Sequence, residues 1–166
     1  DTGMPTIIRD AKVSDAADIR GIYGHYVLHG LSSFEILPPD QAEMKSRLRR
    51  IIDSGHPFLT AETNGAISGY AYASNYRQRE AYDFTLENSV YVSRNYLRQG
   101  IVRLFLSATI NMCDQRGFCQ MIAVIGGSDN YASINLHASC GYKRVGFPPS
   151  TGYQQGRWVD TVLMQR

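Results

Sequence analysis

The hydrophobic pattern of the first third of the chain predicts one strand and two helices. Residues 5–11 form a short apolar run typical of a strand. Apolar positions then recur every three or four residues, from a cap at Ser14 or Asp15 to a stop at Gly30. After a connector ended by two prolines, the same spacing returns over residues 40–55. We therefore expect two amphipathic helices in succession.

The period then changes to two, which predicts strands. Residues 57–62 and 66–76 alternate between apolar and polar positions and are separated by Asn64 and Gly65. This dipeptide favours the positive φ angles of a tight two-residue turn, so the two runs should form a hairpin. A polar stretch leads to a further alternating run at 86–93, predicted to be the next strand.

The last third alternates between the two periods. A helix is predicted after a short loop and ends at Gly117, and the second helix of this part ends at Gly141. The predicted segments are a helix from residue 101, a buried strand at 120–125, a helix at 130–139, and strands at 142–146 and 157–165. The order β-α-α-β-β-β-α-β-α-β-β predicts an α/β fold of the α+β kind, a mixed sheet with helices on both faces.

Composition agrees with an ordinary globular chain. Of 166 residues, 43% are hydrophobic and 19% charged, and the formal net charge is +2. We expect one domain over residues 4–166 and treat the three residues before Met4 as a cloning remnant. The densest basic run, "RLRR" at 47–50, lies within a helical pattern and is interpreted as a solvated helix face. A nucleic-acid surface would show clustered basic residues, so no nucleic-acid partner is expected.

Two further patterns bear on location. No apolar run approaches the roughly 20 residues of a membrane span, and no signal-peptide pattern is seen. The cysteines Cys113, Cys119 and Cys140 lack metal-like spacing, so we expect reduced thiols in a cytoplasmic protein and no metal site. No membrane partner is predicted.

The loop "LRQGIV" at 97–102 lies between a predicted strand and a predicted helix. Loops in this position often hold phosphate, because the first N–H groups of a helix lack partners and the helix dipole is positive there. Such loops usually contain several glycines, whereas this one has Gly100 alone. The loop taken by itself therefore leaves open whether phosphate binds there.

The order of motifs in the second half narrows the choice. The strand, glycine loop, helix and second strand are followed by "DNYASINLHASCGY" at 129–142. This set resembles the GNAT superfamily of acyl-CoA-dependent N-acetyltransferases over nearly the whole chain. The segments "AYDFTLENSVYVS", "QMIAVIGGSDNYASINLHASCGY" and "GRWVDTVLMQR" are similar to the phosphinothricin and methionine-sulfoximine N-acetyltransferases. The resemblance implies acetyl transfer from acetyl-CoA, the co-substrate, to the α-amino group of a small amino acid or analogue, by direct transfer in a ternary complex within a homodimer.

The resemblance also implies two catalytic residues. Glu87 matches the general base of the related enzymes, although position alone would favour a solvated carboxylate at a strand start. Partial desolvation would raise its pKa and make it a better base. His137 stands where many GNAT enzymes have a tyrosine near the CoA sulfur. It would either donate a proton to the thiolate or position the cofactor, and both roles stay open.

A free amino acid needs its carboxylate held. Arg77 and Arg79 have two-residue spacing, so in an extended segment both side chains lie on one side and can converge on one carboxylate. The alternative is a pair of solvated arginines. The resemblance favours substrate binding by these arginines. Phe34 and Tyr82 are candidates for the apolar wall around the acceptor side chain, although either could instead be a core residue.

The CoA-binding residues are likewise implied by resemblance. They are the backbone of Val90, Tyr91 and Val92, the loop residues Arg98, Gln99, Gly100, Ile101, Val102 and Arg103, and Asn130 and Ser133. The related enzymes usually have Arg-Gly-Gln-Gly-Ile-Gly where this chain has residues 97–102. We expect Val102 to lie already in the helix and its branched side chain to crowd the pyrophosphate, with Arg98 compensating for the displaced arginine. Asn130 is also suited to cap the following helix.

Two other functions remain as alternatives. One is a non-catalytic CoA-binding regulatory module on the same fold, and the other is an acetyltransferase acting on a peptide N-terminus. A polyamine acceptor would need an acidic site, and the Arg77 and Arg79 pair has the opposite charge.

Overall fold

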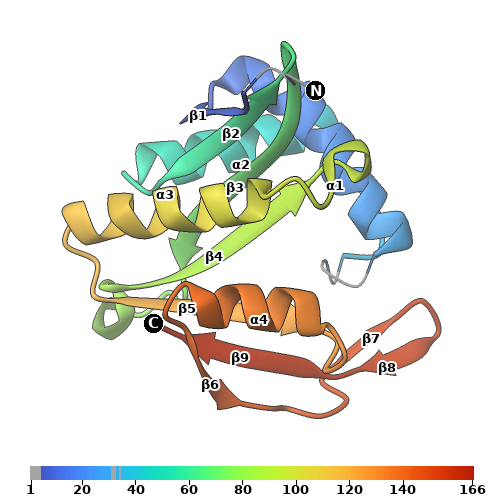
Figure 1. The fold of residues 1–166 in the computed structure, drawn as a ribbon, viewed down its shortest axis with the longest axis vertical. Helices are drawn as coiled ribbons and strands as arrows, with labels where there is room; N and C mark the ends of the chain where they lie inside the picture. Colours follow the sequence, from blue (N-terminus) through green and yellow to red (C-terminus); the bar gives the residue numbers. More distant parts are fainter. Residues whose placement is uncertain (1–4, 31–32, 34) are drawn as a thin grey trace.

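The computed structural model describes residues 5–30, 33 and 35–166. It contains a seven-stranded sheet in the order β1-β2-β3-β4-β5-β9-β6 (Figure 1). The strands are β1 Ile7–Asp10, β2 Phe58–Thr63, β3 Ala66–Asn75, β4 Thr85–Val92, β5 Gln120–Gly126, β6 Lys143–Gly146 and β9 Thr161–Gln165. The helices are α1 Ala16–His29, α2 Gln41–Asp53, α3 Ile101–Gln115 and α4 Tyr131–Ser139. The predicted α/β class and its mixed sheet are confirmed.

Local chemistry explains most element boundaries. Asp40 caps α2, because its side chain accepts a hydrogen bond of 2.8 Å from the Glu43 N–H. Asn64 and Gly65 have φ angles of 54° and 77°, which confirms the tight turn predicted for this dipeptide. Asp15 stands at the N-terminus of α1 but makes no side-chain cap bond to the helix. The predicted cap role is therefore wrong for this residue.

The carboxylate of Asp15 is engaged outside α1. It accepts two hydrogen bonds of 2.9 Å from the Arg9 guanidinium and one of 2.7 Å from the Lys12 N–H. A guanidinium fork matches a carboxylate geometrically, so this pair ties β1 to the start of α1. The arginine and the backbone N–H hold the pKa of Asp15 below its usual range, against the opposite effect of burial.

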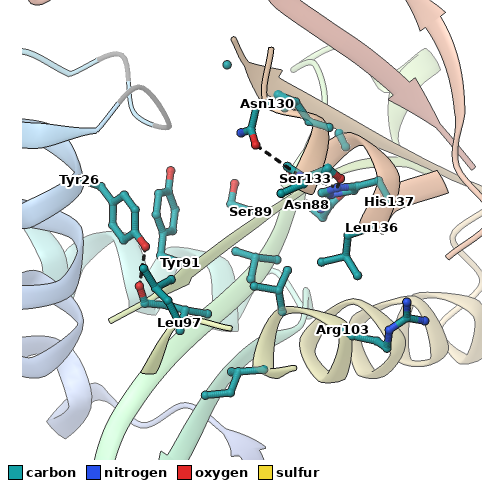
Figure 2. A pocket seen from close by; sticks show the side chains of 18 of the residues that line it. Tyr26, Asn88, Ser89, Tyr91, Leu97, Arg103, Asn130, Ser133, Leu136 and His137 are labelled. Carbon is teal, nitrogen blue, oxygen red and sulfur yellow. Dashed lines mark hydrogen bonds between the residues drawn. The ribbon is translucent and has the colours of Figure 1, made fainter. Parts of the chain in front are cut away.

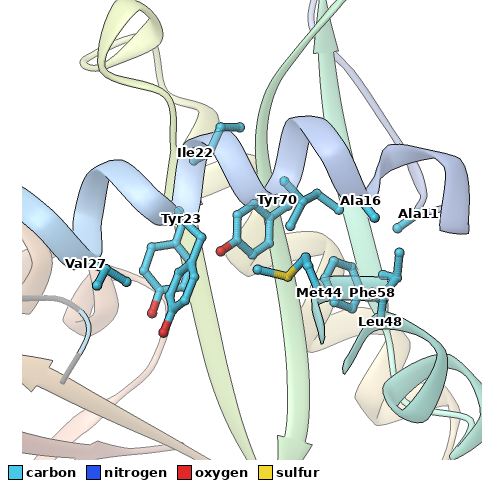
Figure 3. Close-up of a cluster of buried hydrophobic side chains, with 11 residues drawn as sticks. Ala11, Ala16, Ile22, Tyr23, Val27, Met44, Leu48, Phe58 and Tyr70 are labelled. Atoms are coloured by element: carbon cyan, nitrogen blue, oxygen red, sulfur yellow. The ribbon is translucent and has the colours of Figure 1, made fainter. Parts of the chain in front are cut away.

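The helices cover both faces of the sheet. α1 and α2 pack on one face, where Met44 and Leu48 meet Phe58 and Tyr70 (Figure 3). α3 packs on the opposite face, where Phe105 is fully buried against β2 and β3. Because residues along a strand alternate between faces, neighbouring side chains of β4 reach different helix pairs.

The pairing of β4 with β5 is the parallel step in an otherwise antiparallel sheet. It begins at Thr85 and Gln120 and ends at Glu87 and Ile122. Both strands continue beyond that point, to Val92 and Gly126, so they separate and open a gap between them.

The C-terminal part differs from the prediction in one feature. A separate two-stranded hairpin, β7 Gly152–Gln154 and β8 Arg157–Val159, precedes β9. The predicted strand at 157–165 is thus divided at Asp160. The Asp160 carboxylate accepts hydrogen bonds from Ser150 N–H and Ser128 Oγ, which fixes a bend there. Within the described residues, no helix is long and apolar enough to cross a membrane.

Close packing at Gly69 leads to a stability prediction. A Cβ at this position of β3 would lie 2.9 Å from the Tyr91 carbonyl oxygen and 3.0 Å from Phe105 Cε2. We expect Gly69→Ala to lower the free energy of unfolding by about 1–3 kcal/mol through overpacking. Gly21→Ala on α1 meets no atom within 4 Å and should raise stability by about 0.5–1 kcal/mol. Urea denaturation of both variants measures the difference, and equal effects would contradict the packing argument.

Candidate active site

A cleft of about 800 Å³ occupies the gap between β4 and β5 (Figure 2). Its lining comes from α1 on one side, from α4 on the other, and from the loop before α3. Because β4 and β5 separate here, the cleft reaches side chains of both faces of the sheet. Glu87 and His137 therefore line the same cavity although they lie on opposite faces.

Glu87 lies at the last paired position between β4 and β5. Its side chain is half-buried and alternates with Asn88, so it lies on the α1 and α2 face with Ser89 and Tyr91. Burial raises the pKa of this carboxyl above its usual value. The predicted direction of the pKa shift is thus confirmed, and a carboxylate of raised basicity stands where the strands part.

His137 approaches the cleft from α4 and is buried. Its Nδ1 lies 2.8 Å from the Ser133 carbonyl oxygen, and its Nε2 lies 3.3 Å from Nδ2 of Asn88. Desolvation lowers the pKa of the imidazole, although the Ser133 carbonyl opposes this shift. Figure 2 shows Asn88 and His137 with their polar ends adjacent. At neutral pH this histidine is uncharged.

The loop before α3 closes one end of the cleft. Gly100 precedes the helix with a φ of 76°, and Val102 lies in α3 as predicted. Arg98 has a φ of 62°, in the left-handed region that favours glycine. The backbone strain in this loop is therefore at Arg98, where the related enzymes have the first glycine of their motif, and not at Val102.

The remaining residues of that loop differ in whether they line the cleft. Ile101 and Val102 line the cleft, as does Arg103, which also donates a 3.1 Å hydrogen bond to Ser139 Oγ. Gln99 does not line the cleft. Arg98 and Arg103 thus both line the cleft close to the first residues of α3, where an anion is electrostatically favoured.

Asn130 begins α4 and lines the cleft. Its side-chain oxygen accepts a 3.3 Å hydrogen bond from the Ser133 N–H, so the predicted cap is confirmed. Ser133 also lines the cleft, one turn before His137. The start of α4 therefore faces the gap between the strands.

Tyrosines and one serine form the other end of the cleft. The lining residues are Tyr23 and Tyr26 of α1, Tyr72 of β3, Tyr91 of β4, and Ser33. Tyr26 donates a hydrogen bond to the Val92 carbonyl, which ties α1 to β4 beside the gap. Burial raises the pKa of Tyr26 and Tyr72, so both phenols are neutral at physiological pH.

A network of hydrogen-bonded polar side chains adjoins the tyrosine end of the cleft. Tyr23 hydrogen-bonds Ser33 Oγ at 2.8 Å and also donates to the Glu35 carboxylate. Arg47 of α2 makes two hydrogen bonds to Glu35, of 2.9 and 2.6 Å. The interpretation of residues 47–50 as a solvated helix face is thus wrong for Arg47, which connects α2 to the segment between the two helices.

The predicted carboxylate-binding residues do not line the cleft of their own chain. Arg77 is exposed, and its guanidinium lies over the rings of Tyr76 and Tyr82 at 5.2 and 5.6 Å. Arg79 is also exposed and precedes a short 3₁₀ turn. Phe34, the other residue expected in the acceptor wall, lies outside the described residues.

The tyrosines that line the cleft, here called the tyrosine wall, were not predicted from the sequence. A signal was present, because Tyr70 and Tyr72 alternate on β3 and Tyr91 lies within the next strand. Their rings stack in the structure, with centroids 5.2 Å apart for Tyr70 and Tyr91. Among the described residues, no group of three or more histidine, cysteine, aspartate or glutamate side chains could hold a metal ion.

The fold and the open gap between parallel strands define an acyltransferase of the GNAT class. Residues 8–163 match the family model described as an acetyltransferase (GNAT) domain, and the chain belongs to this family. It is 46% identical over 159 residues to a phosphinothricin N-acetyltransferase of Alcaligenes faecalis, covering 96% of this chain and 81% of the relative. It is 35% identical over 160 residues to a Salmonella typhimurium L-methionine sulfoximine/L-methionine sulfone acetyltransferase, covering 95% and 92%.

A solved structure agrees in detail. The phosphinothricin acetyltransferase of Sinorhizobium meliloti, in complex with AcCoA, has a TM-score of 0.94 and 42% sequence identity. The match covers 98% of this chain and 88% of that one. The chain is thus an N-acetyltransferase, and the predictions of family and enzyme class are confirmed.

The left-handed backbone conformation of Arg98 predicts that its substitution has opposite effects on stability and on cofactor affinity. Arg98→Gly should raise the free energy of unfolding by roughly 0.5–1 kcal/mol, because relief of the strain exceeds the entropic cost of glycine. We expect Arg98 to lie near the CoA phosphates, so loss of this cation should also weaken acetyl-CoA binding about threefold to tenfold at low salt. Arg98→Lys is the control and should change neither quantity strongly. Calorimetry and chemical denaturation measure both, and unchanged affinity for Arg98→Gly would remove the electrostatic role.

Proposed function

We propose that this protein transfers the acetyl group of acetyl-CoA to the α-amino group of a small amino acid or analogue. Acceptors of the phosphinothricin, methionine sulfoximine and methionine sulfone type are favoured by the names of its relatives. The observation that carries the proposal is the half-buried Glu87, with a raised pKa, at the point where β4 and β5 separate. A regulatory CoA-binding module would not need a carboxylate of raised basicity there.

The proposed transfer is direct and takes place in a ternary complex. Glu87 accepts a proton from the acceptor ammonium group, directly or through water, which leaves the amine lone pair free to attack the thioester carbon. A C–N bond forms, the C–S bond breaks, and the CoA sulfur leaves with the electron pair. The second proton that the nitrogen loses on becoming an amide passes to water. Backbone groups of Val90 to Val92 along the edge of β4 facing the gap are proposed to polarise the thioester carbonyl.

The proposed CoA arm follows the gap toward α3. Its pyrophosphate would lie at the N-terminus of α3, near Arg98 and Arg103, where the helix dipole and two cations favour an anion. The pantetheine would lie between β4 and β5, with Asn130 and Ser133 at its side. Gln99 does not line the cleft, so no contact with the cofactor is proposed for it.

The tyrosine end of the cleft is the proposed acceptor site. Neutral phenols and Ser33 provide hydrogen-bonding groups and apolar walls suited to a small polar amino acid. The cations that line the cleft, Arg98 and Arg103, are at the CoA end, and Arg47 near the tyrosine end is already paired with Glu35. A carboxylate at the acceptor end would therefore need a cation from another source.

We propose that this cation comes from a second copy of the chain. Arg77 and Arg79 are exposed and lie outside their own cleft, so a homodimer could bring them to the cleft of the partner. Exposed apolar side chains, among them Ile36, Leu37 and Trp158, support burial against another copy. The three free cysteines are consistent with a reducing compartment, and we propose a cytoplasmic location.

The proposed base leads to a kinetic prediction. Glu87→Gln should lower kcat about 100-fold or more at pH 7.5, with acetyl-CoA affinity unchanged. In the wild type, kcat should fall as the pH decreases through the raised pKa of Glu87, because the protonated acid cannot accept a proton. The measurement is release of free CoA thiol with phosphinothricin, methionine sulfoximine, a panel of free amino acids and a short peptide as acceptors.

Controls separate chemistry from folding. Asp53→Asn removes one exposed carboxylate of α2 and should leave kcat unchanged. Burial disfavours the ionised form of Glu87 in the folded state, so stability from this group is lost as the pH rises through its raised pKa. Glu87→Gln should therefore keep or raise Tm at pH 7.5. Thiol release with the peptide alone would favour the peptide acetyltransferase, and no release with any acceptor would favour the CoA-binding module.

The homodimer proposal predicts complementation between two impaired variants. Glu87→Gln and Arg77→Ala each disable the enzyme for amino-acid acceptors if both roles are correct. A mixed dimer contains one cleft with an intact Glu87 and an intact Arg77 from the partner, so random pairing should restore about a quarter of wild-type activity. Coexpression with two affinity tags isolates the mixed dimer. Absence of recovery in a purified mixed dimer would mean that Arg77 does not act across subunits.

A further inference from the structure

Three buried side chains form a continuous hydrogen-bonded row beside the cleft. Tyr142, which follows α4, donates from its hydroxyl to Asn88 Oδ1 at 2.9 Å. The other end of the Asn88 amide, Nδ2, lies 3.3 Å from His137 Nε2. His137 Nδ1 lies 2.8 Å from the Ser133 carbonyl oxygen. The ring of Tyr142 also meets the imidazole edge to face, with centroids 5.1 Å apart.

The positions of the hydrogen atoms in this row follow from which atoms can donate and which can only accept. A carbonyl oxygen only accepts, so the Nδ1 of His137 must carry the proton in its bond to Ser133. In a neutral imidazole the Nε2 then has a lone pair and no proton. The Asn88 Nδ2 can only donate, and it faces that lone pair. Because the Tyr142 hydroxyl donates to Asn88 Oδ1, the amide presents its NH₂ group to His137.

We propose that Asn88 and Tyr142 are positioning residues that hold His137 as the neutral Nδ1–H tautomer. This assigns a role to two residues beyond the proposed catalytic set, and its catalytic meaning rests on the proposed function. His137 has no proton on Nε2 to give to the thiolate, and its Nδ1 proton is bound to the Ser133 carbonyl. His137 therefore lines the cleft as a neutral side chain in a fixed orientation. It neither gains nor loses a proton during acetyl transfer.

The charges around the imidazole agree with a neutral ring. On β4, Glu87 is adjacent to Asn88 in sequence, but alternation places its side chain on the other face of the sheet. On α3, Arg103 reaches Ser139 Oγ, at the C-terminal end of α4, and Cys113 lies near Tyr142. No salt bridge among the described residues involves His137.

The remaining titratable groups near this row are Cys113, Cys140 and Arg166. Arg166 donates to the Cys140 carbonyl, and its charge opposes the stronger effect of burial on Tyr142. Burial raises the pKa of both Tyr142 and Cys113, so the hydroxyl and the thiol stay protonated at neutral pH. Desolvation has the opposite effect on the imidazole and favours its neutral form.

The tautomer can be observed without any assay of activity. Long-range ¹H–¹⁵N NMR of the full chain, labelled with ¹⁵N-histidine, distinguishes protonated from bare ring nitrogens, and His137→Gln identifies the signal. We expect a protonated Nδ1 and a bare Nε2 for His137 at neutral pH and above, because desolvation lowers the pKa of the imidazole. A protonated Nε2 at pH 7.5, in either the other tautomer or the imidazolium, would overturn the proposal.

Substitution of Asn88 tests the positioning role. In Asn88→Asp a carboxylate faces Nε2 and can only accept, so the imidazolium becomes favourable and the pKa of His137 should rise by about 1–3 units. In Asn88→Ala the ring should stay neutral. We expect kcat to fall about tenfold or more in Asn88→Asp, with the KM for acetyl-CoA within about threefold. Asn111→Asp adds the same charge on the exposed surface of α3 and should change neither quantity.

The outcomes separate this inference from the proposed function. An unchanged kcat in folded Asn88→Asp, despite a raised pKa of His137, would overturn the positioning role and leave acetyl transfer intact. If the wild type acetylates no acceptor, the proposed function fails while the NMR experiment still decides the tautomer. If Asn88→Asp does not fold, Tyr142→Phe keeps the ring beside His137 and removes only the donor to Asn88. Mixed ring protonation and a lower kcat support the proposal there, and wild-type values for both contradict it.

Discussion

The early end of the β4–β5 ladder is the constraint on which the rest of the site depends. Three residue pairs join the two parallel strands, and the ladder stops at Glu87 and Ile122. Had the pairing continued, backbone hydrogen bonds would fill the space that is now a cleft. The separation also exposes both faces of the sheet to one cavity. Side chains that alternate to opposite sides, such as Glu87 and Asn88, can then act around a single ligand.

Much of the fold follows from local sequence signals. The Asn64–Gly65 turn, the Asp40 cap and the Asn130 cap all act within a few residues, and each is confirmed. The β7–β8 hairpin was not predicted, because its strands have three residues each and show no clear alternation. Asp15 was misjudged because its best partner, Arg9, lies in a different element. Local rules fail where a long-range partner competes for the same atoms.

The candidate site, like the fold, could be predicted from the sequence only in part. Motif resemblance led to Glu87, His137 and the loop before α3, and the structure places all of these around one cleft. Motifs could not show the tyrosine wall, since it combines α1, β3 and β4, and aromatic residues are more often core. They also could not show that Arg77 lies outside the cleft of its own chain. Both features depend on the tertiary arrangement.

The two titratable groups at the centre of the cleft are shifted by the same physical cause in opposite chemical directions. Burial penalises charge, so it raises the pKa of Glu87 and lowers that of His137. The carboxylate becomes a better proton acceptor, while the imidazole loses the proton that an acid would need. A site of this kind has a carboxylate of raised basicity and an imidazole that is a poor proton donor. It is suited to a reaction in which an amine must lose a proton and the leaving group, a thiolate, is stable enough to depart without gaining one.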